Sequence, residues 1–90
     1  MSDIGKPITL SIGTTAVKVY PERRGGRSYL MVQNNGSSGI RMANNIDADA
    51  NGGIRIAPGL AKEYTGNEAP NGYISVVSES GTNSVTFQEY

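Results

Sequence analysis

Apolar and polar residues alternate along this chain in short runs, and each run is soon followed by Gly, Pro or Asn. In the first run Ile8, Leu10 and Ile12 are apolar and the residues between them are polar. A period of two is typical of a strand with one buried face. Strands are predicted in this way at residues 7–12, 16–20, 28–34, 40–43, 53–57, 60–65, 73–78 and 84–89. No stretch of ten or more residues has helical spacing. We therefore expect an all-β fold of about eight short antiparallel strands, in a sandwich or flattened barrel.

Turn residues separate the expected strands. Asn35-Gly36 is the strongest hairpin signal, because both residues tolerate a positive φ. Pro58-Gly59 and residues 81–83 mark further turns. No repeat or linker divides the chain, so we expect one β domain over residues 7–90, preceded by a flexible arm at residues 1–6.

The apolar positions of the alternating runs define the expected core. The middle of residues 28–34 is apolar on both faces, which predicts a central strand covered on both sides. The first strand, the short strand at 60–65 and the last strand are expected at sheet edges. The predicted core positions are Ile8, Leu10, Ile12, Val17, Val19, Leu30, Val32, Ile40, Met42, Ile54, Ile56, Ile74, Val76, Val85 and Phe87.

The chain has 90 residues, no Cys and no His. A domain of this size buries only ~60–70% of the surface of its unfolded chain, and disulfides and the usual structural zinc sites need Cys or His. Since these two sources of additional stability are excluded, we expect the domain to be stabilised by oligomerisation or by docking on a partner. We expect a homo-oligomer, a dimer or trimer, that forms through exposed strand edges, because proteins must charge, bend or cover such edges.

Eight basic residues balance eight acidic ones, which gives no electrostatic argument for binding nucleic acid or an anionic membrane. The first residues are polar and lack the apolar region of a signal peptide. No apolar run approaches the ~18–20 residues of a membrane span. We expect neither a nucleic-acid nor a membrane partner, and no signal peptide.

Catalysis is difficult to place on this sequence. The commonest general base and the thiol nucleophile are missing, because there is no His and no Cys. The acidic residues are scattered over loops and strand ends, without the apolar neighbours that raise a carboxyl pKa. We interpret them as solvated groups and expect a protein that is not an enzyme and needs no cofactor.

Asp47, Asp49 and Asn51 stand at alternate positions before Gly52, as the first ligands of an EF-hand loop do. Because alternate side chains of a curling loop converge on one point, these three residues are candidates for binding calcium. They are weak candidates, because the rest of the loop does not match. The twelfth position of such a loop needs a bidentate Glu, and here it is Pro58. We favour a polar turn in which Asp and Asn cap their own backbone, and we expect no metal site.

The candidate interface residues form two groups. The cluster of Arg23, Arg24 and Arg27 beside two glycines could clamp a phosphate or a carboxylate. A solvated loop or a salt bridge between subunits is the interpretation we favour, because nucleic-acid binding normally shows a basic excess. The second group is tyrosines at the ends of elements, where a half-buried ring with a wet hydroxyl suits an interface. These tyrosines are Tyr20, Tyr64 and Tyr90.

Three segments together resemble a known group of proteins. Residues 27–34 end in Gln-Asn before a short turn, residues 54–59 end in Pro-Gly, and residues 72–86 carry a Ser-Gly-Thr turn before the last strand. This order over about residues 27–87 is similar to small β-sandwich virion proteins of tailed bacteriophages. These occur as head decoration or cement proteins and as accessory modules of tails and fibres.

The resemblance implies a virion structural protein of the capsid decoration type, made in the host cytoplasm. Its partners would be the major capsid protein or another virion protein, together with further copies of the chain. The alternatives are a tail or fibre accessory module, and a carbohydrate- or calcium-binding β module.

The missing carboxylate at Pro58 leads to a direct prediction about calcium. Two Asp and one Asn leave the ion short of its usual oxygen ligands, about six to eight. We expect isothermal titration to detect no calcium binding tighter than ~10⁻⁴ M, the weak end of natural loop sites. Tighter binding would mean that other oxygens complete the site.

Overall fold

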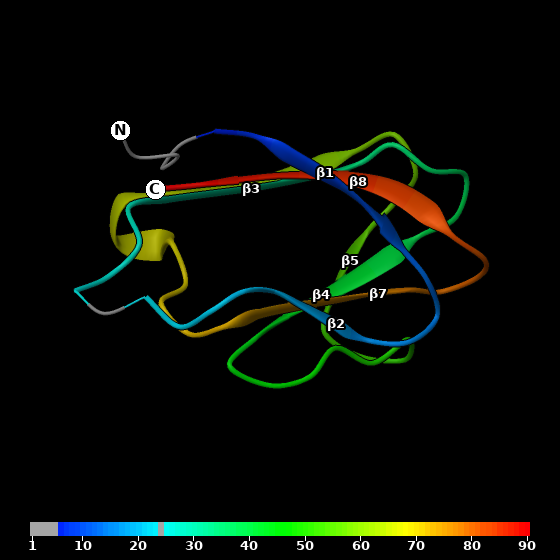
Figure 1. Ribbon diagram of the computed structural model, residues 1–90, viewed down its shortest axis with the longest axis horizontal. Coiled ribbons are helices and arrows are strands. Elements are labelled where there is room, and N and C mark those ends of the chain that lie inside the picture. Colours follow the sequence, from blue (N-terminus) through cyan, green and yellow to red (C-terminus); the bar gives the residue numbers. More distant parts are fainter. Residues whose placement is uncertain (1–5, 24) are drawn as a thin grey trace.

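The computed structural model describes residues 6–23 and 25–90. It consists of eight strands in two antiparallel four-stranded sheets that face each other (Figure 1). The strands are β1 (Ile8–Ile12), β2 (Val17–Tyr20), β3 (Tyr29–Asn34), β4 (Ile40–Asn44), β5 (Ile54–Ile56), β6 (Ala61–Thr65), β7 (Ile74–Ser78) and β8 (Asn83–Glu89). A single 3₁₀ turn, Gly66–Glu68, follows β6, and the described residues contain no α-helix. The predicted all-β sandwich is confirmed. The predicted arm falls almost entirely on residues 1–5, which lie outside the described residues.

Along the chain, the strands alternate between the two sheets, with one exception. The first sheet, sheet A, has the order β1-β8-β3-β6, and the second, sheet B, has the order β2-β7-β4-β5. Successive strands lie in opposite sheets, except for β4 and β5, which pair as neighbours, and the first strand pairs with the last. This arrangement is the eight-stranded jelly roll.

The core is the apolar layer between the sheets. Cross-strand register places the apolar positions of each strand on the same face as those of its neighbours, as in Val32 of β3 opposite Phe87 of β8. Val19, Tyr20 and Tyr64 are half-buried against this layer. The fully buried members are Ile12, Leu30, Val32, Ile40, Met42, Ile56, Ile74, Val76, Val85 and Phe87, all of them predicted.

Four predicted core residues were assigned wrongly. Ile8, Leu10, Val17 and Ile54 keep between 37% and 41% of their surface exposed. Their register partners are buried, so they point toward the same layer. They lie on β1, β2 and β5, which are edge strands and lack a neighbour on one side. The apolar layer is therefore open along the sides of the sandwich.

Two predictions about strand positions also need correction. The last strand, β8, is not an edge, because it lies between β1 and β3. The strand predicted to be covered on both faces, β3, is uncovered on its outer face, where Gln33 is exposed. The strand that is buried on both faces is β7, all of whose residues are buried. The segment at residues 45–53 lies over the outer face of β7, with Ala48 beside Val77. The Ala48 N–H donates to Ser75 Oγ at 2.9 Å.

Asn35-Gly36 does not form a hairpin, because it joins β3 in sheet A to β4 in sheet B. Two buried side chains hold this crossing. Asn34 Nδ2 donates to the carbonyl oxygens of Ser38 and Ile56, at 2.8 and 3.0 Å, and Asn83 Oδ1 accepts from the Ser38 N–H. A Cβ at Gly36 would collide with the Asn83 side chain. The glycine is therefore needed for close approach rather than for a hairpin turn.

The open side of the sandwich predicts a contrast between Val76 and Val17, which face each other in β7 and β2. Val76 is fully buried, whereas Val17 is 39% exposed. Val76→Ala should lower the free energy of unfolding by about 2–3 kcal/mol, through lost transfer energy and a cavity. Val17→Ala should cost no more than ~1 kcal/mol, since its site is already partly solvated. Urea denaturation measures both, and equal losses would show that the β2 side is closed.

Candidate functional site

Arg27 lies in the connection between β2 and β3, and its side chain is completely buried. Its Nε donates to Glu89 Oε1 at 2.8 Å, and its Nη2 donates to the Pro21 carbonyl at 3.1 Å. Its Nη1 donates to the carbonyl oxygens of Pro70 and Gly72. A guanidinium has five N–H donors in a planar fork, which suits this set of acceptors. Arg27 thus joins the β2–β3 and β6–β7 connections to the end of β8.

The same cluster reaches the core through Tyr20. The Arg27 Cζ lies 5.9 Å from the centre of the Tyr20 ring, and that ring meets Phe87 edge-on at 6.2 Å. Burial, with a smaller contribution from the charge of Glu89, raises the pKa of Tyr20 to about 12. Arg23 forms a second ion pair with Glu89, at 3.0 Å. These groups act together to close one end of the sandwich.

The predicted surface role of Arg27 is therefore wrong, because the guanidinium has no exposed surface. Arg23 is partly exposed, with 25% of its side chain accessible. Arg24 lies outside the described residues. Of the predicted arginine cluster, only Arg23 is thus described with surface that a partner could contact.

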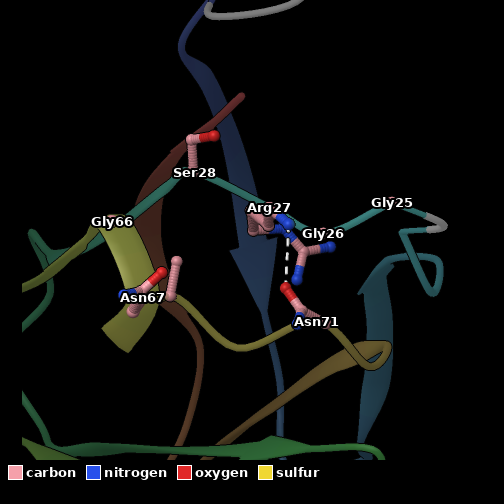
Figure 2. A pocket seen from close by; sticks show the side chains of 8 residues that line it. Gly25, Gly26, Arg27, Ser28, Gly66, Asn67 and Asn71 are labelled. Carbon is pink, nitrogen blue, oxygen red and sulfur yellow. Dashed lines mark hydrogen bonds between the residues drawn. The ribbon is translucent and has the colours of Figure 1, made fainter.

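A cleft of about 310 Å³ lies beside this cluster (Figure 2). The Asn71 side chain at its wall accepts a hydrogen bond from the Arg27 backbone N–H at 2.8 Å. Gly25 and Gly26 have φ values of 81° and 94°, which other residues rarely adopt, so glycine shapes this wall. The lining residues are Gly25, Gly26, Arg27, Ser28, Gly66, Asn67, Ala69 and Asn71. Because the Arg27 charge is paired with Glu89, the cleft offers amide and hydroxyl groups and suits a neutral polar molecule better than a phosphate.

The loop with the calcium candidates is held by its own hydrogen bonds. Asp49 Oδ1 accepts from the Asn51 N–H at 2.9 Å, which confirms the predicted backbone cap. Asp47 Oδ1 accepts from the Tyr73 hydroxyl at 3.0 Å. In the described part of the chain, no three His, Cys, Asp or Glu side chains gather in a way that could hold a metal ion.

The three predicted interface tyrosines lie in different surroundings. Tyr20 is part of the Arg27 cluster. The Tyr64 hydroxyl is buried on β6 without a hydrogen-bond partner in the described residues, and burial raises its pKa. Tyr90 is 46% exposed and stacks on Tyr29 with ring centres 4.9 Å apart. Tyr29, which is not among the predicted interface residues, also donates to Glu63 Oε2 at 2.6 Å. Of the three, only Tyr90 is an exposed residue, and one face of its ring is covered by Tyr29.

The outer face of sheet A, which we call the A face, is nearly free of charge. The hydroxyls of Thr9 and Thr86 lie 3.0 Å apart across β1 and β8, and Asn35 Nδ2 also donates to Thr86. Among the outward-facing residues of this sheet only Glu63 is charged. The outward positions are Thr9, Ser11, Tyr29, Met31, Gln33, Ala61, Glu63, Thr65, Ser84, Thr86 and Gln88. Charge depletion is typical of the centre of a protein interface.

The outer face of sheet B is different. Arg41 and Arg55 both contact Glu79, at 2.7 and 2.9 Å, and these bonds, first that of Arg55, hold the pKa of the Glu79 carboxyl below its ordinary value. Lys18 lies 4.4 Å from the centre of the Tyr73 ring. The segment at residues 45–53 covers part of this face. The A face is thus the uncovered, weakly charged surface of the sandwich.

The fold is shared with a solved structure. The solution NMR structure of a de novo designed double-stranded beta-helix is similar to this chain, with a TM-score of 0.59 and 10% sequence identity over 94% of this chain and 99% of that one. At this identity the likeness shows the fold alone. No protein-family model matches the sequence, and no curated protein matches it. Among the described residues, no helix is long and apolar enough to cross a membrane.

The Arg27 cluster predicts an unequal effect of two arginine substitutions. Arg27→Met takes from Glu89 the buried one of its two arginine partners, so that only Arg23 remains, and leaves three carbonyl groups around this buried site without their donor. This should cost about 3–5 kcal/mol of unfolding free energy. Arg55→Met removes a contact from a side chain that is 47% exposed, and should cost no more than ~1 kcal/mol. Chemical denaturation compares the two. Similar losses would mean that Arg27 does not hold this end of the sandwich.

Proposed function

We propose that this chain is a virion structural protein of the capsid decoration type, made in the host cytoplasm and bound to an assembled shell through protein contacts. The observation that carries the proposal is the A face, an uncovered sheet surface with a single charged residue, Glu63, among its outward positions. Its partner would be the major capsid protein or another virion protein. A tail or fibre accessory module would use the same surface.

Two further arguments support this proposal. Jelly rolls are building blocks of viral capsids, and they also occur as lectins and as cupins. His is the commonest metal ligand, and the sequence has none, which counts against an enzyme built on a histidine-bound metal. The resemblance of residues 27–87 to small phage virion proteins points in the same direction as the A face. Since a fold hosts many functions, the surface carries more weight than the topology.

Particles of the phage that carries this gene test the proposal. The protein should remain with virions through density-gradient purification and be detectable in them by mass spectrometry. Gln33→Lys places a charge in the middle of the A face, where a desolvated and unpaired charge should reduce attachment at least ~10-fold. Asn51→Lys is the matched control on an exposed loop outside this face. Absence of the protein from purified particles would contradict the proposal, as would equal effects of the two substitutions.

Carbohydrate binding is a second candidate, favoured by the polar cleft beside Arg27. Its size lies at the lower end of small-molecule sites, and Asn67, Asn71 and Ser28 supply groups that can hydrogen-bond sugar hydroxyls. Clear hits on a glycan array, lost in Asn67→Ala, would favour this function over attachment to a shell.

A further inference from the structure

Each sheet ends in two edge strands, and three of the four are protected against pairing with another chain. β6 carries Lys62 and Glu63, and β5 carries Arg55. β2 carries Lys18, and its register with β7 is interrupted there. Charges and bulges are the usual protection of exposed edges. β1, with the sequence Ile-Thr-Leu-Ser-Ile, has neither a charge nor a proline, and its register with β8 is continuous.

The residue pattern of β1 is the same in both directions. Ile8 and Ile12 flank the strand symmetrically, Thr9 and Ser11 are both small hydroxyl residues, and Leu10 lies at the centre. In an antiparallel pair centred on Leu10, each Ile8 faces Ile12 of the second copy, and the two Leu10 residues face each other. Apolar side chains then meet on the core side, and Thr9 meets Ser11 on the A face.

We propose that β1 pairs antiparallel with β1 of a second copy of this chain, with Leu10 on the twofold axis. The pairing joins two A sheets into one continuous sheet and satisfies the free backbone groups of both edges. It also covers Ile8 and Leu10, which are 38% and 37% exposed although they point toward the core layer. A twofold contact of this kind uses the same patch on both copies and closes on itself.

The charges near β1 and its residue pattern favour a second copy of this chain, rather than an unrelated strand, as the partner of this edge. The same register places Lys6 of one copy opposite Thr14 of the other, so the two lysines lie at opposite ends of the paired strands. No like charges face each other within the five paired positions. An unrelated strand would have to match a pattern that β1 already matches with itself.

The size of the contact sets the expected affinity. A ladder of five residues falls well below the ~1,200–2,000 Å² buried in stable interfaces, so self-association of the free protein should be weak. Attachment to a common shell would raise the local concentration and favour the pair. The inference deepens the proposed structural role, but its test uses the purified protein alone. Failure of the pairing can therefore be distinguished from absence from virions.

Single cysteines introduced into this Cys-free chain test the register. Directly opposed residues of an antiparallel pair have Cα atoms ~4.5–5.5 Å apart, which suits a disulfide. Under mild oxidation Leu10→Cys should link to itself at least ~10-fold faster than Ala61→Cys, an exposed control on edge strand β6, because pairing raises the effective thiol concentration. Thr9→Cys and Ser11→Cys should link poorly alone and efficiently when mixed, since each faces the other.

The mixed pair keeps the test decisive if Leu10→Cys unfolds, because both of its side chains point away from the core. Rapid linking of the Thr9→Cys and Ser11→Cys mixture, with slow linking of each alone, supports the proposed register. Equal rates of disulfide formation in all variants, including Ala61→Cys, would overturn the proposal, because they would mean that the cysteines of β1 meet only by random collision. Fast self-linking of Thr9→Cys alone would also overturn it, because that result requires a different register.

Discussion

The apolar layer between the two sheets is the interaction on which the rest of the structure depends. The chain has no disulfide and no His or Cys for a structural zinc site, so this layer must supply most of the stability of a 90-residue domain. It is closed at one end by the Arg27 cluster, where Glu89 and backbone carbonyls satisfy a buried guanidinium. Along the sides it remains open, and residues such as Leu10 point toward the core while keeping more than a third of their surface exposed. These open sides and the A face are the two surfaces on which a partner or a second copy could bind.

Local signals in the sequence were enough to predict the strands. Alternation and turn residues placed all eight within a few residues of their observed bounds, because a period of two decides which side chains share a face. The same signals could not decide which strands are neighbours. The pairing of Ile8 with Phe87 spans nearly the whole chain, and nothing near Phe87 shows that β1 will cover its strand. For this reason the predictions of an edge position for the last strand and of a hairpin at Asn35-Gly36 are wrong.

The candidate site was predicted less well than the fold. The cap made by Asp49 was predicted because its partner, Asn51, is two residues away. The burial of Arg27 was missed because Glu89 and Pro70 are far away in the sequence, and a buried arginine looks the same in the sequence as a solvated one. The A face did have a sequence signal. Most outward residues of sheet A, such as Thr9 and Thr86, are polar but uncharged, and they can be recognised as one surface only once the sheet order is known.

The central claim is that the uncharged edge of β1 is a pairing surface. Residue-resolved hydrogen–deuterium exchange of the backbone amides, measured over a range of protein concentrations, tests it most directly. The account predicts that amides of β1 that face away from β8 exchange more slowly as the concentration rises, because a second copy occupies them. Amides on the outer edge of β6, which carries Lys62 and Glu63, should show no such change. Exchange in β1 that does not depend on concentration up to the solubility limit would contradict the claim.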